Sequence, residues 1–195
     1  PVVFLFLGSF MLAAAMSRHG LDKRLALTVL GLPGVGGRPW RLMGAFGLVA
    51  LLTSMWISNT ATTAMLFPIA VGLLRAMGEA SGARPGGRYA TGLMLMTAYA
   101  ASVGGIATPI GTPPNLIGRG LLQELLGIRL SFFAWMQFAV PITLVTFAYL
   151  VVLMRLLHRD PAIEAHPPEA LEGWLARRRA DLGPWTRGEV NTCAV

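Results

Sequence analysis

Two short polar segments lie within otherwise apolar sequence, and they carry the side chains best suited to chemistry. The first polar segment, residues 54–63, reads Ser-Met-Trp-Ile-Ser-Asn-Thr-Ala-Thr-Thr. The second polar segment, residues 108–115, reads Thr-Pro-Ile-Gly-Thr-Pro-Pro-Asn. Hydroxyl and amide groups are costly in hydrocarbon unless something there binds them. We therefore predict that the two segments face each other inside a membrane and hold a cation and an anion between them.

The anion would be held by the N-terminal ends of two helices. Ser58, Asn59 or Thr60 can cap a helix that begins in the first polar segment. Thr112 can cap a second helix, because the prolines that follow it are tolerated in a first helical turn. The unpaired amide groups at such ends carry partial positive charge. Two ends aimed at one cavity suit a carboxylate, sulfate or phosphate without any Lys or Arg.

The cation would be held by neutral oxygen atoms. A broken helix frees backbone carbonyls, and the side chains of Ser54, Ser58 and Asn59 add to them. Ser54 and Ser58 are four residues apart and share a helix face, while Gly111 lets its backbone approach the ion. Residues 42–77 and 89–115 contain no Asp, Glu or His. Since proton-coupled carriers usually keep such a residue at membrane depth, neutral oxygens favour Na⁺ as the coupling ion.

The composition is that of a membrane chain. Of 195 residues, 54% are hydrophobic and 13% are charged, with a mean hydropathy of +0.61; soluble domains carry about 25% charged residues. The net charge of +7 does not indicate nucleic-acid binding, because the basic residues lie in short connectors between apolar runs. The single Cys193 excludes a disulfide framework or a thiolate metal cluster within this chain.

We expect an all-α integral membrane protein, and we expect this chain to be a fragment of it. The chain opens inside an apolar run without an initiator Met. The predicted elements, in order, are a transmembrane helix with a truncated start (1–17), an interfacial helix and turn on the cytoplasmic side (18–41, helical over 25–32), a re-entrant hairpin (42–77), a cytoplasmic loop (78–88), a discontinuous transmembrane helix (89–128, its first half ending at Gly104-Gly105), a transmembrane helix (129–157), a cytoplasmic connector (158–189) and the start of a missing second half (190–195).

The length of the segment 42–77 favours the re-entrant hairpin. As one helix it would be about 54 Å long, far more than the ~30 Å that a single crossing needs. Two crossings would need roughly 40 residues plus a turn. A hairpin that enters and leaves on the same side, with its tip at residues 58–60, fits best. Broken backbone at membrane depth is tolerated where it is buried in protein or lines a cavity, so the tip is predicted to be a site.

The distribution of basic residues agrees with this topology. With a re-entrant hairpin, fourteen of the sixteen Lys and Arg residues lie on one side of the membrane, and the exceptions are Arg119 and Arg129. By the positive-inside rule, the side with the fourteen is cytoplasmic. We therefore expect an inner-membrane or plasma-membrane protein whose basic loops are cytoplasmic.

These motifs, in this order, resemble the divalent anion:sodium symporter (DASS) family. The similarity runs from Pro1 to about Arg159 and includes the opening Pro-Val-Val-Phe-Leu-Phe-Leu-Gly, Gly-Leu-Asp-Lys at 20–23, the first polar segment, Gly-Gly-Ile-Ala at 104–107 and Gly-Thr-Pro-Pro-Asn at 111–115. The resemblance implies an elevator-type homodimer built of inverted repeats, of which this chain is most of the first. A second Ser-Asn-Thr motif is absent here, so half of the substrate site and a second Na⁺ site would lie elsewhere.

The resemblance also implies roles for individual residues. The positions that match the family's Na⁺ site are Ser54, Ser58, Asn59 and Gly111. The positions that match its substrate site are Ser58, Asn59, Thr60, Thr112 and Pro113. The implied partners are a small divalent anion, membrane lipid and a second copy of the full-length protein, with no nucleic acid.

Other functions remain open at this stage. A Na⁺-independent anion exchanger or a passive anion channel of the same architecture would share these motifs, because re-entrant loops also build selectivity filters. An intramembrane enzyme would need a nucleophile with a base, or paired Asp residues, at membrane depth. No Gly-x-Ser-x-Gly or His-Glu-x-x-His motif is present. We therefore predict a transporter rather than an enzyme, without choosing among succinate, malate, citrate and sulfate.

Overall fold

The computed structural model describes the central part of the chain together with scattered positions near both ends. The described residues are 8, 11, 14–15, 18–31, 35, 38–81, 87–160, 173, 176–177, 180–181, 183–184 and 186–187. Most of the predicted first transmembrane helix (1–17), most of the connector (158–189) and all of 190–195 therefore lie outside the described residues. The described part is all helical, as expected, and contains no strand.

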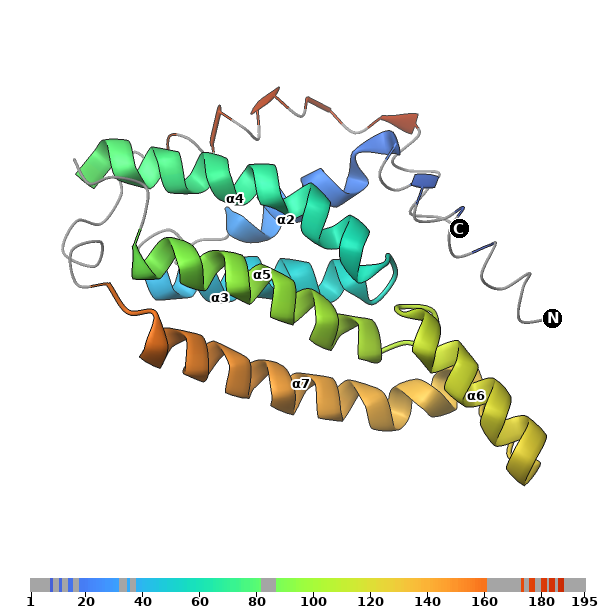
Figure 1. Ribbon diagram of the computed structural model, residues 1–195. Helices are drawn as coiled ribbons and strands as arrows, with labels where there is room; N and C mark the ends of the chain where they lie inside the picture. Colours follow the sequence, from blue (N-terminus) through green and yellow to red (C-terminus); the bar gives the residue numbers. More distant parts are fainter. Residues whose placement is uncertain are drawn as a thin grey trace.

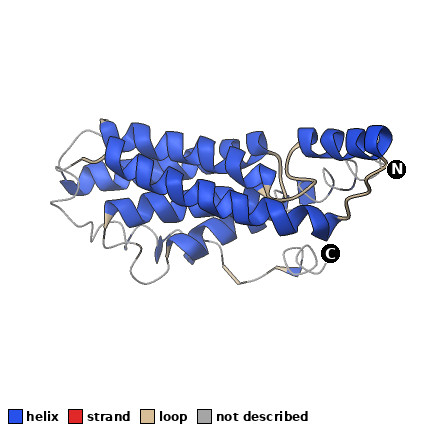
Figure 2. Cartoon of the chain, turned by 90° about the horizontal axis from the view of Figure 1, so that it is seen from below, coloured by secondary structure: helices blue, strands red, loops and turns tan. Residues whose placement is uncertain are grey.

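Four long helices lie lengthwise beside one another (Figure 1). They are α3 (Pro39–Ser54), α4 (Asn59–Ser81), α5 (Arg88–Ile106) and α7 (Phe132–Leu157). Helix α5 packs against α3, α4 and α7, whereas the short α2 (Leu21–Leu30) packs against α3 and α4. Helix α6 (Pro113–Leu126) projects beyond the end of the bundle (Figures 1 and 2). The α2 helix begins and ends earlier than the predicted 25–32.

Local sequence explains where these helices begin and end. Helix α3 starts with Pro39 in its first turn, after Arg38 in an extended conformation, as expected for the residue before a proline. The Ser131 hydroxyl accepts a hydrogen bond from the Ala134 amide at 3.1 Å and caps α7. Gly127 ends α6 in the left-handed conformation, with a φ of 69° that favours glycine.

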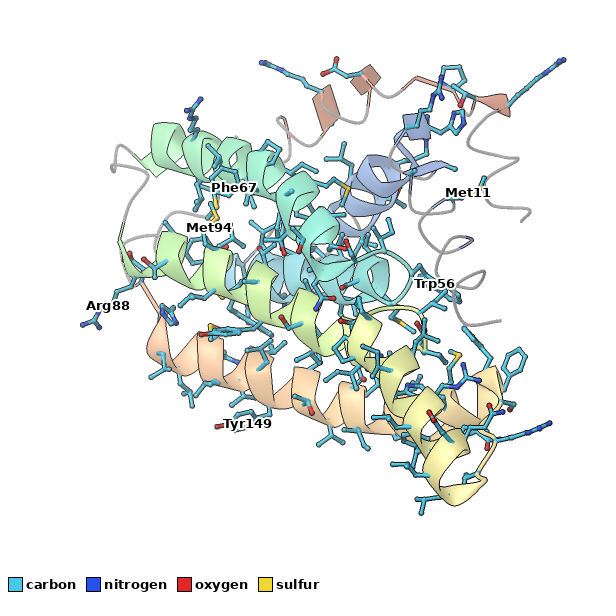
Figure 3. All side chains as sticks on the ribbon, turned by 45° about the vertical axis from the view of Figure 1, so that its right-hand side comes forward. Met11, Trp56, Phe67, Arg88, Met94 and Tyr149 are labelled. Carbon is cyan, nitrogen blue, oxygen red and sulfur yellow. The ribbon has the colours of Figure 1, made fainter. Side chains whose placement is uncertain are left out.

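The core lies between α3, α4 and α5. Large apolar side chains from these helices are fully buried, among them Leu42, Phe46, Leu66, Leu73, Leu93 and Met96. Helix α7 differs, because only 17% of its 18-residue apolar stretch is buried. Its Tyr149 projects away from the bundle (Figure 3). With 26 residues and a mean hydropathy of 2.1 over its 18-residue apolar stretch, α7 is the one candidate membrane span among the described residues. It ends at residue 157 as predicted, and it begins three residues after the predicted start at 129.

Helices α3 and α4 run in opposite directions and are joined by residues 55–58 (Figure 1). The interruption therefore precedes Asn59 and Thr60, which belong to the first turn of α4, rather than centring on residues 58–60 as predicted.

Aromatic side chains attach α7 to both ends of the α3 helix. Trp56, in the turn after α3, stacks on Phe132 at the start of α7, with ring centroids 6.5 Å apart. At the other end of the bundle, the Arg155 guanidinium lies 4.5 Å from the Trp40 ring.

The prediction that the first half of the discontinuous helix ends at Gly104-Gly105 is wrong, because α5 continues to Ile106. Both glycines lie inside the helix and are buried. A Cβ atom on Gly104 would lie 2.7 Å from the Cα atom of Leu51. The glycine therefore lets the backbones of α3 and α5 touch, which is a packing role rather than a helix stop.

Replacing Gly104 tests this backbone contact. We expect Gly104→Ala to destabilise the purified full-length protein by about 1–3 kcal/mol, the usual cost of overpacking, because α3 and α5 must move apart. The matched control is Gly120→Ala in α6, where an added Cβ meets nothing within 4 Å. Thermal unfolding in detergent measures both variants. Equal melting temperatures for the two would contradict the proposed contact.

Candidate functional site

The first polar segment contains a helix start capped as predicted. The Ser58 hydroxyl accepts a hydrogen bond from the Ala61 amide at 3.3 Å, and the Ser58 carbonyl accepts one from the Thr62 amide at 3.0 Å. Ser58 is therefore the N-cap of α4. The amide groups of Asn59 and Thr60 open the helix, so they have no acceptor within it. They are the groups of this end that can donate to an anion.

The second helix start, at α6, differs from the prediction in one respect. Thr112 occupies the N-cap position in an extended conformation, but its hydroxyl makes no capping hydrogen bond. The reason is that Pro113 and Pro114 have no N–H to donate, while the Asn115 amide donates to the Thr112 carbonyl at 3.2 Å. This helix end therefore presents fewer amide donors than that of α4. The Thr112 hydroxyl, unused by the helix, is its main polar group.

The two helix interruptions are residues 55–58, between α3 and α4, and residues 107–112, between α5 and α6. They are in direct contact. The Thr108 hydroxyl donates a hydrogen bond to the Met55 carbonyl, and the same oxygen accepts one from the Gly111 amide at 3.0 Å. Asn115 donates through Nδ2 to the carbonyls of Gly105 and Thr108, both at 2.8 Å. Thr108 is fully buried and Asn115 is 8% exposed. The expected meeting of the two polar segments is therefore present.

Three of the four predicted cation ligands come together where the segments meet. The Ser54 hydroxyl donates to Oδ1 of Asn59 at 2.7 Å. A Cβ atom on Gly111 would lie 3.0 Å from the Ser54 carbonyl oxygen, so that backbone also lies against Ser54. The fourth, Ser58, uses its hydroxyl oxygen to cap α4. The cluster holds neutral oxygens, which suit a hard monovalent cation.

The predicted anion-binding residues are more accessible than the cation cluster. Thr60 and Pro113 are exposed, and Ser58, Asn59 and Thr112 are half-buried, whereas Ser54 is fully buried. A cation at Ser54 would therefore lie deeper in the bundle than an anion near Thr60 and Thr112. Among the described residues, no group of three or more His, Cys, Asp or Glu side chains gathers to bind a metal.

Several residues that build this site make contacts that the sequence did not predict. A Cβ on Gly105 would collide with the Asn59 side chain, so this glycine makes room for it. Trp135 donates through Nε1 to the Ile106 carbonyl at 3.0 Å and attaches α7 to the end of α5. Thr63 donates to the Asn59 carbonyl at 2.8 Å. The paired glycines and the buried polar residues were visible in the sequence, but their partners were not.

Thr62 is a further polar residue at this end of α4. It is 1% exposed, and its hydroxyl oxygen has no hydrogen-bond partner within the described part of the chain. It lies one helical turn after Ser58 and therefore on the same face of α4. Its buried position is that of a packing residue.

A double-mutant cycle tests the Ser54–Asn59 hydrogen bond. We expect Ser54→Ala and Asn59→Ala each to lower the stability of the purified protein, and their effects to couple by about 1 kcal/mol, because either substitution removes the same bond. Thermal unfolding of both single variants and the double variant in Na⁺-free buffer gives the coupling. Strict additivity would show that the two side chains do not interact.

The family model described as citrate transporter (CitMHS) matches residues 1–184. A sodium-dependent dicarboxylate transporter, SdcS, of Staphylococcus aureus (strain USA300) is 33% identical over 148 residues, covering 74% of this chain and 28% of that protein. The protein of the same name from Staphylococcus saprophyticus is 34% identical over 157 residues, covering 77% of this chain and 29% of its own length.

The chain thus spans less than a third of the curated relatives that it matches. These relatives are transporters, not enzymes, in agreement with the sequence analysis. The resemblance to the divalent anion:sodium symporters is confirmed. Because the family model matches nearly the whole length of the chain, the chain belongs to the citrate transporter family.

Proposed function

We propose that the full-length protein containing this chain is a secondary active transporter that couples Na⁺ to the uptake of a divalent anion. The anion is a di- or tricarboxylate, or sulfate. The observation that carries this proposal is the contact between the two helix interruptions, because it gathers neutral oxygens and helix starts at one place. The names of the family and of its relatives, which refer to citrate and to sodium-dependent dicarboxylate transport, support the same conclusion.

The ligands are divided between the two segments. Na⁺ is bound by Ser54, Ser58, Asn59 and Gly111. The anion is bound by Ser58, Asn59, Thr60, Thr112 and Pro113, with the amides at the start of α4 as the principal donors to a carboxylate oxygen. Asn59 belongs to both sets, which gives a physical route for coupling, because Na⁺ on its oxygen orients the carboxamide and adds positive charge beside the anion. The remaining anion ligands come from outside this chain.

The same proposal includes the membrane arrangement. The α3–α4 hairpin is re-entrant, α5 and α6 form one discontinuous span and α7 is a complete span. The protein is an elevator-type homodimer of inverted repeats in the inner or plasma membrane, in contact with lipid, and its basic loops are cytoplasmic. The exposed apolar surface of α7 suits either lipid or the remainder of the protein.

Asn59→Ala tests the transport function. We expect at least a tenfold loss of Na⁺-driven uptake of radiolabelled succinate or citrate into proteoliposomes that contain the full-length protein, since removing a ligand to a charged group costs about 1.5–3 kcal/mol. The control is Gln137→Ala, which removes an exposed amide from α7.

The same assay separates the proposal from its rivals. The proposal requires wild-type uptake that depends on an inward Na⁺ gradient and that accumulates the anion above its external concentration. Equal uptake when choline replaces Na⁺ would instead indicate a Na⁺-independent exchanger. Rapid equilibration without accumulation would indicate a passive channel.

A further inference from the structure

Thr108 joins the two helix interruptions through a single hydroxyl group. As donor it reaches the Met55 carbonyl in the turn after α3, and as acceptor it receives the Gly111 amide in the turn before α6. Thr108 is fully buried, and Met55 lies 53 positions away in the sequence. The hydroxyl is therefore a bridge between segments that no continuous helix connects.

Asn115 holds the same turn from the other side. Its side-chain amide donates to the carbonyls of Gly105, within α5, and Thr108, within the turn, at 2.8 Å each. Both donors of that NH₂ group are thereby used. The start of α6 is consequently tied to the end of α5 across the interruption, and these bonds set the position of the Thr108 backbone.

These bonds determine which oxygens of the site already have a partner. The carbonyls of Met55, Gly105 and Thr108 all accept hydrogen bonds from within the protein. The Asn59 oxygen accepts one from Ser54, which can turn its proton away when a cation arrives. The backbone of Gly111 lies against the Ser54 carbonyl, at the place where the Thr108 hydroxyl anchors its amide.

We propose that Thr108 is a positioning residue for Na⁺ binding. Its hydroxyl holds the Gly111 backbone next to Ser54 and Asn59, so that ligands from the two segments are preorganised around one cation. Thr108 does not touch the ion itself, and it acts through Met55 and Gly111. This inference rests on the proposed function, because it refines the Na⁺ site described above.

A matched threonine in α5 allows a sharp control. Thr97 is 2% exposed and donates to the Leu93 carbonyl of its own helix at 2.8 Å. Both threonines are buried, and Thr→Val removes one hydroxyl from each with little change in shape. Only Thr108 bridges the two interruptions. A purely structural role for the hydroxyl would give the two variants the same pattern of effects.

The experiment compares Thr108→Val, Thr108→Ser and Thr97→Val in the full-length protein. We expect Thr108→Val to raise the Na⁺ concentration for half-maximal uptake by about tenfold, because two hydrogen bonds are lost. The maximal rate at saturating Na⁺ should change by less than about twofold, since the ligands themselves remain. Thr108→Ser keeps the hydroxyl and should restore wild-type Na⁺ dependence, and Thr97→Val should leave it unchanged. Stabilisation of the purified protein by NaCl without substrate gives a second readout.

The possible outcomes are distinguishable. If the rate of wild-type uptake does not depend on the Na⁺ concentration, both the proposed function and this inference are wrong. Na⁺-dependent wild-type uptake, with the same half-maximal Na⁺ concentration in Thr108→Val and Thr97→Val, would overturn this inference alone. If Thr108→Val fails to fold, Thr108→Cys replaces it, because its thiol is a weak donor. The inference then requires a raised half-maximal Na⁺ concentration, and a wild-type value would overturn it.

Discussion

Interrupted backbone inside an apolar bundle must find hydrogen-bond partners, and this requirement governs the rest of the structure. Each buried carbonyl or amide left without a partner costs about 1–3 kcal/mol. The Thr108 hydroxyl supplies partners to both turns, because it donates to a carbonyl in the turn of residues 55–58 and accepts from an amide in the turn before α6. Asn115 completes the arrangement by bonding two further carbonyls. A helix break that would be unstable alone is stabilised by a second break beside it.

That solution requires close approach, and glycine provides it. Gly104 lies against the backbone of Leu51, and Gly105 makes room for the Asn59 carboxamide. Gly111 lies within contact of the Ser54 and Gly105 backbones. A side chain at any of these three positions would push apart the elements that the polar contacts hold together. The glycines and the polar residues therefore act together, because the hydrogen bonds can form only where the glycines let the backbones approach.

The two helix starts that meet here are chemically unequal. Helix α4 begins with amide groups that are free of intrahelical partners, and Ser58 caps it. Helix α6 begins with two prolines, which supply the correct φ but no donors. An anion between them would be bound mainly by backbone amides on one side and by the Thr112 hydroxyl on the other. Surrounding packing orients both, since Trp56 attaches the turn of residues 55–58, and Trp135 attaches the end of α5, to the first part of α7.

The sequence by itself determined which segments are helical and where the polar chemistry lies. Proline positions, capping hydroxyls and the apolar run of α7 act locally, so the starts of α4 and α6 and the end of α7 could be predicted from neighbouring residues. Of the candidate site, the membership of Ser54, Asn59 and Gly111 in one cluster was predicted from the expected meeting of the two polar segments and from the family resemblance, not from neighbouring residues.

Only the tertiary structure decided what each of these groups contacts. Gly104-Gly105 could be read as a helix stop, but packing against α3 keeps α5 helical to Ile106. The bridging role of Thr108 depends on a partner 53 residues away, which no local pattern encodes. The unused hydroxyl of Thr112 follows from the missing donors of two prolines once the helix has formed. Composition and capping are properties of neighbours in sequence, whereas hydrogen-bond partners across a bundle are set by how the helices pack.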